Sequence, residues 1–201
     1  MNGLGTVFLV DDDGAFRTAA SQLLNAAGLD VQAFESAEAF LARGVKDAPG
    51  CLLTELQMPG LSGLELQTAL AKAGVHLPVV FLCGHGDIPT CVQAMRSGAE
   101  DFLAKGAPKE KVFEAVNRAL ARDARERSER TKRASLRALL ATLTVREHEV
   151  LEYVVQGKMN KQIAHALGLH ERTVKLHRTA ITTKLGRHST AELTQLWLET
   201  R

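Results

Sequence analysis

Residues 6–14 read TVFLVDDDG, a short apolar run that ends in three consecutive aspartates. A buried strand of a parallel sheet has this form, because helices cover both of its faces. Similar runs follow at residues 30–34, 51–55, 78–82 and 101–104. Segments with helical periodicity separate them, at residues 15–27, 37–43, 64–73 and 88–97, and a fifth begins at Pro108. The alternation predicts an α/β domain with a flavodoxin-like, doubly wound parallel sheet.

The composition is that of a protein with a hydrophobic core and no membrane span. Of the 201 residues, 45% are hydrophobic, which excludes a fully disordered chain. No apolar run approaches the roughly 18 residues that cross a bilayer, and residues 1–5 do not resemble a signal peptide. Cys51, Cys83 and Cys91 have spacings that fit neither a CxxC pair nor a zinc site. We therefore expect a cytoplasmic protein with reduced thiols.

The net charge of +2 conceals an asymmetry along the chain. Residues 1–120 carry 9 Lys and Arg against 14 Asp and Glu, whereas residues 121–201 carry 16 against 9. A basic segment after an acidic one favours contact with a polyanion, although two ordinary solvated surfaces would give the same counts. Residues 122–137 hold seven basic and three acidic side chains without Gly or Pro, which predicts a solvated helix. We divide the chain into an α/β domain at 1–121, a charged helical linker at 122–141 and an all-α domain at 142–201.

Polar side chains gather at the carboxyl ends of the predicted strands, which meet at one edge of a parallel sheet. Glu55 is expected to end the third strand, and Cys83 and Lys105 to follow the fourth and fifth. The full set at this edge is Asp11, Asp12, Asp13, Glu55, Cys83 and Lys105. Carboxylates opposite a lysine suit Mg²⁺ with an anion beside it, because Mg²⁺ prefers oxygen ligands and the ammonium group balances added negative charge. Alternatively, Asp12 or Asp13 only caps the helix that follows.

Four motifs extend this pattern in order. They read VDDD at 10–13, MPGLSG at 58–63, GHGDIP at 84–89 and DFLAK at 101–105. They resemble the receiver domain of bacterial two-component response regulators, and GHGDIP is most similar to the FixJ branch. The resemblance implies that Asp11 and Asp12 hold Mg²⁺, that Lys105 is the lysine of the pocket and that Phe102 occupies the aromatic switch position.

The phosphoacceptor position, an aspartate in that family, falls on Glu55. The extra methylene moves the carboxylate by about 1.5 Å, and a misplacement of ~1 Å can lower a rate ~100-fold. Cys83 stands at the Thr or Ser position, where a thiol is a poor donor, and Gly106 replaces the usual Pro. These departures predict that phosphotransfer is lost, with residual phosphorylation as the alternative. Glu55 then either pairs with Lys105 and mimics the phosphorylated state or belongs to a silent scaffold.

Cys83 and His85 lie next to the predicted pocket, and we assign neither of them a role in its chemistry. We expect Cys83 to be a small buried hydrophobe rather than a redox sensor, and His85 to be a loop residue rather than a metal ligand. No cofactor is expected to be obligatory, and the residues that would hold Mg²⁺ are Asp11, Asp12 and Glu55.

Residues 142–201 show short helical segments punctuated by glycine. Thr144 and Glu147 have the spacing of a capping box before an apolar helix. Further helices are expected at 160–167, 171–185 and 190–199, with a tight turn through Gly168. The apolar stripe of the segment 171–185 is Val174, His177, Ile181 and Leu185, so His177 is expected in the core. A short helix, a tight turn and a basic helix are typical of a helix-turn-helix domain.

The motifs GKMNKQIA at 157–164, TVKLHR at 173–178 and KLG at 184–186 resemble the LuxR-type domain of the NarL/FixJ family. The resemblance implies double-stranded DNA as the ligand. Base contacts are implied for Lys175, Leu176 and Thr179, with Arg178 alongside them. Phosphate contacts are implied for Lys161, Thr173, Lys184 and Arg187. The helix at 190–199 either pairs two DNA-bound copies or completes the core through Trp197.

Together these features predict a cytoplasmic transcription regulator of the NarL/FixJ type that acts without Asp phosphorylation. We expect a homodimer formed by the fourth and fifth receiver helices, including Val92, Met95 and Val112. The other expected partners are promoter DNA and a sensor kinase or another regulator, and no membrane is involved. The alternatives are a pocket that still responds to phosphorylation and a protein-interaction module that docks on a kinase or regulator. An enzyme is not expected, because no second nucleophile and base accompany the acids.

Overall fold

The computed structural model describes residues 5–44, 48–84 and 88–200. The chain forms two compact units, Met1–Arg127 and Ser128–Arg201, and each is described by itself. Within the described ranges, no helix combines the length and the apolar character needed to cross a membrane.

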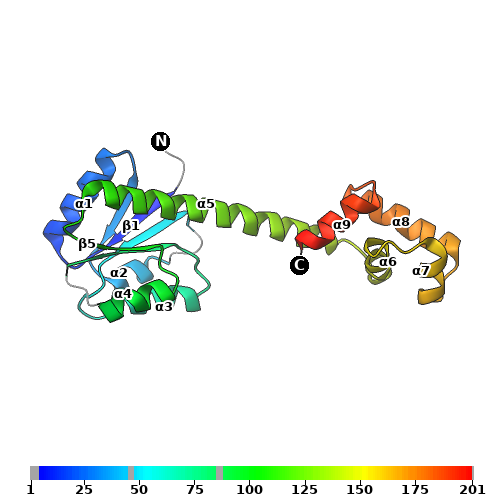
Figure 1. Ribbon diagram of the computed structural model, residues 1–201, viewed down its shortest axis with the longest axis horizontal. Helices are drawn as coiled ribbons and strands as arrows, with labels where there is room; N and C mark the ends of the chain where they lie inside the picture. The colour runs from blue at the N-terminus through cyan, green and yellow to red at the C-terminus, as the bar shows by residue number, and fades with distance from the viewer. Residues whose placement is uncertain (1–4, 45–47, 85–87, 201) are drawn as a thin grey trace. The chain divides into compact units, whose positions relative to one another are not determined.

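The first unit contains a parallel sheet with the strand order β2-β1-β3-β4-β5 (Figure 1). Its strands are β1 (Thr6–Val10), β2 (Asp30–Phe34), β3 (Gly50–Thr54), β4 (Val79–Cys83) and β5 (Asp101–Ala104). The chain adds β2 on one side of β1 and then β3, β4 and β5 on the other, so the strand order reverses between β1 and β3. Ligands of such folds bind outside the carboxyl ends of the strands at that point. The predicted flavodoxin-like α/β fold is confirmed.

Two strands differ by one residue from the expectation. β3 begins at Gly50, which pairs with Thr6, and ends at Thr54, so Glu55 follows the strand instead of ending it. β4 extends to Cys83, which pairs with Ala104, so Cys83 lies within the strand instead of after it. The reason is that backbone pairing with the neighbouring strand sets these ends, and an apolar run in one sequence does not show that register.

Helices cover both faces of the sheet (Figure 1). One face carries α1 (Gly14–Ala26) and α5 (Lys109–Leu140). The other carries α2 (Ala37–Ala42), α3 (Gly63–Lys72) and α4 (Ile88–Arg96). Alternate residues of each strand point to opposite faces, so in β1 Val7 and Leu9 pack toward the first face and Phe8 and Val10 toward the second. Both faces of the sheet are therefore buried, as the uninterrupted apolar runs predict.

α5 continues to Leu140, so all but the last residue of the predicted helical linker, 122–141, are helical. Asp123 is fully buried, and its Oδ2 accepts the N–H of Gly50 at 2.8 Å and Nε–H of Arg127 at 2.8 Å. Nη2 of Arg127 donates to the carbonyl oxygen of Ala48 at 2.5 Å. These contacts hold α5 against the start of β3, and the first unit therefore includes residues 122–127.

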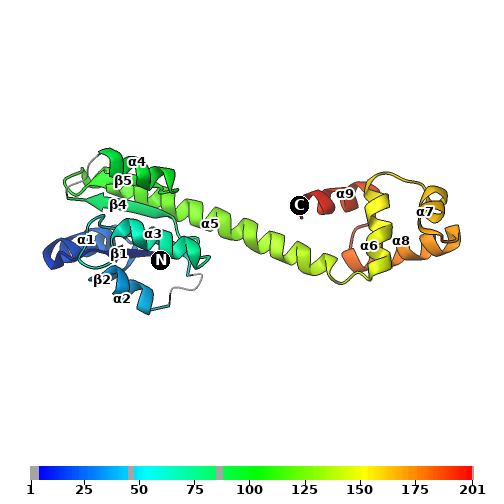
Figure 2. The ribbon, with the colours of Figure 1, turned by 90° about the horizontal axis from the view of Figure 1, so that it is seen from below.

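The second unit contains the end of α5 and a group of short helices (Figure 2). They are α6 (Val145–Val155), α7 (Asn160–Leu167), α8 (Glu171–Leu185) and α9 (Thr190–Glu199). The predicted capping box is present, since Thr144 and Glu147 each accept the other's backbone N–H. The core comprises Val150, Leu151, Val154, Ile163, Ala164, Val174, Ile181, Leu185 and Leu193.

His177 is half-buried, so its expected place in the core is corrected. At 3.6 residues per turn it points about 60° away from Val174, which puts it at the edge of the buried stripe. An imidazole at that edge keeps contact with solvent.

Candidate functional site

Three charged side chains meet at the carboxyl ends of the strands in the first unit. Asp11 follows β1, Glu55 follows β3 and Lys105 follows β5. Nζ of Lys105 lies 2.7 Å from Oδ2 of Asp11 and 2.9 Å from Oε2 of Glu55. The same ammonium group lies 4.4 Å from the ring centre of Phe16 in α1, within the range of a cation–π contact. The parallel sheet thus brings one cation against two carboxylates that are distant in sequence.

Backbone N–H groups complete the surroundings of the Glu55 carboxylate. Its Oε1 accepts from Leu56 at 2.7 Å and from Gln57 at 3.4 Å, and its Oε2 accepts from Gly84 at 3.2 Å. Glu55 is only 5% exposed, and a buried carboxylate is costly unless it is paired and hydrogen-bonded. Donors within the protein therefore hold the negative charge at position 55.

Burial and hydrogen bonding shift the pKa values of Asp11 and Glu55 in opposite directions. The pKa of Asp11 is raised, because burial outweighs the hydrogen bonds from Lys105 and from the Asp13 N–H. Burial also acts to raise the pKa of Glu55, but the hydrogen bonds from Lys105, Leu56 and Gly84 together lower it. Burial acts to lower the pKa of Lys105, but its bonds to both carboxylates raise it. Glu55 and Lys105 are consequently both charged at neutral pH.

The three consecutive aspartates have different environments. Asp11 is fully buried, whereas Asp12 is exposed. The side chain of Asp13 accepts the N–H groups of Ala15 and Phe16 and caps α1. The capping alternative therefore holds for Asp13.

Two other pocket residues predicted from the sequence lie on β4 and β5. Cys83 is buried at the end of β4, and the N–H of Lys105 donates to its carbonyl oxygen at 2.9 Å. Phe102 is half-buried, with its ring centre 6.0 Å from that of Phe81. His85 lies outside the described residues.

In this arrangement Lys105 contacts two of the three carboxylates, those of Asp11 and Glu55, that the sequence proposes as magnesium ligands. In the part of the chain that the structure describes, no group of three or more His, Cys, Asp and Glu side chains is placed to hold a metal. The ammonium group of Lys105 contacts both Asp11 and Glu55, and Asp12 is exposed. Mg²⁺ usually keeps several waters and binds through one or two carboxylates, so an ion held by Asp11 or Glu55 would share that carboxylate with Lys105.

In the second unit, α8 has one buried and one exposed face. The exposed residues are Glu171, Arg172, Lys175, Leu176, Thr179, Thr183 and Lys184. α7 leads into α8 through Gly168, whose φ of +66° is a left-handed conformation that glycine adopts without strain. A helix, a tight turn and a second helix with an exposed basic face form the arrangement that enters the major groove of DNA.

The residues predicted to contact DNA fall into different environments. Lys161, Lys175, Leu176 and Thr179 are exposed, whereas Thr173 and Arg187 are half-buried. Helical periodicity places Arg172 and Thr183 on the same exposed face of α8, although the predicted set of DNA contacts leaves them out.

Arg178 contacts the first residues of two other helices. Its Nη1 donates to Oδ1 of Asn160 at 3.2 Å and to the carbonyl oxygen of Lys158 at 3.4 Å. Its Nη2 donates to the hydroxyl of Thr190 at 3.3 Å. Arg178 therefore links α8 to the starts of α7 and α9.

Lys184 is bound within the unit as well. Its Nζ lies 2.6 Å from Oε2 of Glu147, the capping residue of α6, and 3.4 Å from the carbonyl oxygen of Thr142. These bonds join the last turn of α8 to the first turn of α6. The capping-box pattern identifies Glu147, but it gives no sign of a partner 37 residues away.

Comparison with known proteins gives a family for each unit. Residues 7–117 match the response regulator receiver domain, and residues 141–197 match the bacterial regulatory proteins of the luxR family. Transcriptional regulatory protein FixJ of Azorhizobium caulinodans is 41% identical over 192 residues, which are 96% of this chain and 91% of the relative. The chain is a response regulator of the NarL/FixJ family.

Other proteins with similar sequences and structures support the same family assignment. Nodulation protein W of Bradyrhizobium diazoefficiens is 42% identical over 190 residues, which are 94% of this chain and 84% of the relative. The solved structure of response regulator StyR is 41% identical, has a TM-score of 0.88 and covers 96% of this chain and 98% of its own. The family consists of DNA-binding transcription regulators, not of enzymes.

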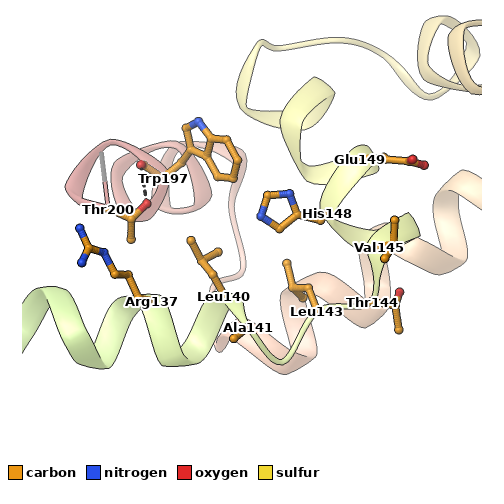
Figure 3. Close-up of a pocket in the computed structure, with 10 residues that line it drawn as sticks. All are labelled: Arg137, Leu140, Ala141, Leu143, Thr144, Val145, His148, Glu149, Trp197 and Thr200. Atoms are coloured by element: carbon orange, nitrogen blue, oxygen red, sulfur yellow. Dashed lines mark hydrogen bonds between the residues drawn. The ribbon is translucent and has the colours of Figure 1, made fainter.

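The DNA-binding unit of the regulator also contains a cavity of about 680 Å³ (Figure 3). Trp197 of α9 and His148 of α6 line it, with their ring centres 5.3 Å apart. Trp197 packs half-buried against the core, and Leu193 and Leu196 beside it are buried. Trp197 therefore contributes to the core, one of the two roles expected for it.

Proposed function

We propose that this regulator binds promoter DNA without phosphorylation of its receiver, and that Glu55 is a fixed negative charge at the phosphoacceptor position. The observation that carries the proposal is the 2.9 Å ion pair between Oε2 of Glu55 and Nζ of Lys105. A phosphoryl group would bring negative charge to this lysine, and Glu55 supplies a permanent charge there. One carboxylate has less charge than a phosphoryl group, which carries about −1.5 to −2 at neutral pH, so the mimicry is partial.

The chemistry of the pocket supports the loss of phosphotransfer. A phosphoryl acceptor must attack in line with the leaving group, so its oxygen must be free and correctly placed. Both oxygens of Glu55 already accept hydrogen bonds, and Oε2 is also paired with Lys105. Cys83 supplies only a weak thiol donor where the family has a hydroxyl. Magnesium is not part of the proposal.

DNA contact is proposed for the exposed face of α8. Lys175, Leu176 and Thr179 would meet base edges, and the exposed Lys161 would meet a phosphate. Thr173 and Arg187 are proposed phosphate contacts from the edges of this face. Because Arg178 and Lys184 are bound to other helices, we assign them to positioning α8. A regulator that acts on promoters in this way works in the bacterial cytoplasm.

A homodimer is proposed through α4 of the receiver. Ile88, Val92 and Met95 are 81%, 43% and 46% exposed, which makes α4 an apolar surface. Val112 was expected in this contact but is only 8% exposed, because it packs against the sheet with α5. Light scattering should show dimers of the unphosphorylated protein. A strict monomer at high micromolar concentration would contradict the proposed homodimer.

The proposal is tested by DNA affinity on a selected binding site. Wild type and Glu55→Asp are compared with and without acetyl phosphate and Mg²⁺. We expect wild type to bind and to ignore acetyl phosphate, and Glu55→Asp to become responsive. A wild type that needs acetyl phosphate would show that the pocket still works and that the proposal is wrong.

Glu55→Gln separates the two interpretations of the pocket, because it keeps the size of the side chain and removes its charge. If Glu55 mimics the active state, this variant loses affinity for DNA. If the receiver is a silent scaffold, its affinity stays at the wild-type value. Absence of DNA affinity in wild type at low salt would instead favour a protein-interaction module.

A further inference from the structure

A cavity of about 170 Å³ lies in the receiver between α1 and α5, on the face of the sheet that these two helices cover (Figure 1). Its floor is formed by Leu24 of α1, Leu53 of β3, Leu82 of β4 and Val112 of α5, all of which are buried. Ala20 of α1 also lines it, and its single methyl group adds little volume to the packing between the helices. The interior of the cavity is therefore apolar.

The rim of this cavity carries positive charge. Lys105 and Lys109 line it, beside the exposed Leu23. The ammonium group of Lys105 is already bound by Asp11 and Glu55. Lys109 is exposed, and among the described residues no acidic side chain is paired with it. Lys109 therefore remains available to an anion at the rim.

The size and the charge of the cavity together select a class of ligand. An apolar cavity of about 150 Å³ accommodates benzene, so the receiver cavity has room for an apolar group of about six carbons. Ligand pockets combine an apolar lining with a few polar groups that orient the ligand, and here Lys109 is such a group. A wholly polar anion would gain nothing from the interior, and an uncharged hydrocarbon would make no use of Lys109.

We propose that this cavity binds a small aliphatic monocarboxylate. The tail lies against the buried leucines of the floor, and the carboxylate pairs with Nζ of Lys109. Phe16, whose ring centre is 4.4 Å from Nζ of Lys105, also lines the cavity, so a bound tail would contact the side chain that packs on the charged cluster of the receiver. The inference concerns the receiver alone and does not depend on DNA binding.

The test is isothermal titration calorimetry of the full-length protein with butanoate, hexanoate, octanoate and decanoate at low salt. Hexanoate should bind about 15-fold more tightly than butanoate, because two further buried methylene groups contribute ~0.8 kcal/mol each. The increase should end once the tail is longer than the cavity, so decanoate should bind no more tightly than octanoate. Hexanamide, which has the same tail without the charge, should bind about threefold more weakly than hexanoate, the effect of one exposed ion pair.

One variant fills the cavity. Ala20→Leu places a larger apolar side chain in it and should lower the affinity for hexanoate at least as much as the loss of two methylene groups from the ligand. Urea unfolding should show that the receiver keeps its stability. Ala26→Leu is the matched control, because Ala26 is exposed at the end of the same helix and does not line the cavity. It should bind hexanoate as wild type does.

A second variant removes the charge at the rim. Lys109→Met should bind hexanoate and hexanamide equally and keep the wild-type affinity for hexanamide. Lys111→Met is its control, because Lys111 is an exposed lysine of the same helix that does not line the cavity. This control should keep the preference for the carboxylate.

Several results would overturn the inference. No heat of binding with any acid of the series would show that the cavity takes no such ligand. An affinity that continues to rise through decanoate would indicate adsorption to the protein surface. An Ala20→Leu variant that binds hexanoate as wild type does would place the ligand elsewhere, and equal losses in Lys109→Met and Lys111→Met would show that no specific lysine holds the carboxylate.

Discussion

Lys105 in the receiver and Lys175 in the DNA-binding unit are the same residue type in opposite circumstances. Lys105 follows the half-buried strand β5 and contacts Asp11 and Glu55 at 2.7 and 2.9 Å. Lys175 lies on the exposed face of α8. Burial is costly for an unpaired charge, so the receiver must balance its charges internally. A solvated charge on a helix surface has no such requirement and remains available to a polyanion.

The two lysines differ in what an approaching charged ligand has to displace. A ligand that approaches the receiver pocket meets carboxylates that are already paired, and it must displace Lys105 before it can bind them. A ligand that approaches α8 displaces only water and counterions from Lys175. The two lysines therefore differ in what must move before a ligand binds: Lys105 is engaged by carboxylates of its own unit, and Lys175 is exposed to solvent.

The largest expected effect comes from removing the buried cation. Lys105→Met leaves Asp11 and Glu55 without a counter-charge and should lower the free energy of unfolding of the receiver. We expect about 3 kcal/mol, the lower end for a broken buried pair, because the side chain of Lys105 is 19% exposed. Urea unfolding followed by circular dichroism measures this change.

The matched control is Lys175→Met, which makes the same chemical change on the surface. It should alter the free energy of unfolding by less than about 0.5 kcal/mol. Trp197, the one tryptophan of the chain, reports by fluorescence that the DNA-binding unit unfolds normally in Lys105→Met. Equal stability losses in the two lysine variants would break the contrast between the units.

The next effect concerns DNA. Lys175→Ala should weaken binding to the selected site by about 1–3 kcal/mol if Lys175 contacts a base. Lys184→Ala serves as the control, because Lys184 is already bound to Glu147 and should contribute less to DNA affinity. Titrations with selected and random duplexes at two salt concentrations separate the loss of base contacts from the loss of phosphate contacts. Equal losses on selected and random DNA would make Lys175 a phosphate contact instead.

Much of the fold could be predicted from the sequence because the central strands β1, β3 and β4 are buried on both faces. β1, β2 and β5 have the predicted limits, and the strand ends bring Asp11, Glu55 and Lys105 together as expected. Helical periodicity likewise placed the limits of α7, α8 and α9.

The partners of long charged side chains could not be predicted in the same way. Lys184 and Arg178 have the spacing and charge of surface residues, but each reaches a helix terminus that is distant in sequence. Their bonds depend on how α6, α7 and α9 pack around α8, which no local pattern records. The prediction that Val112 lies in the dimer contact is wrong for a related reason. An apolar residue on a helix does not show which face of that helix meets the sheet.

The smallest effect tests a charge that is paired within the DNA-binding unit. Hydrogen bonds from Lys184 and from the Thr144 N–H lower the pKa of Glu147 in the folded state. Folding therefore favours the ionised carboxylate, and this stabilisation is present above the ordinary pKa of 4.5 and disappears as the pH falls through the lower folded value. We expect a contribution of about 1 kcal/mol, since Lys184 is partly exposed.

Urea unfolding followed by Trp197 fluorescence at pH 7, 5, 4 and 3 measures this contribution. Glu192 and Glu199 in the same unit also have lowered pKa values, so wild type loses stability in acid for more than one reason. The difference between wild type and Glu147→Gln isolates the pair, and it should shrink as the pH falls below 4.5. A difference that is constant across this range would show that the charge of Glu147 does not stabilise the unit. Only its hydrogen bond to the start of α6 would then matter, and Lys184 would be as free to bind DNA as Lys175.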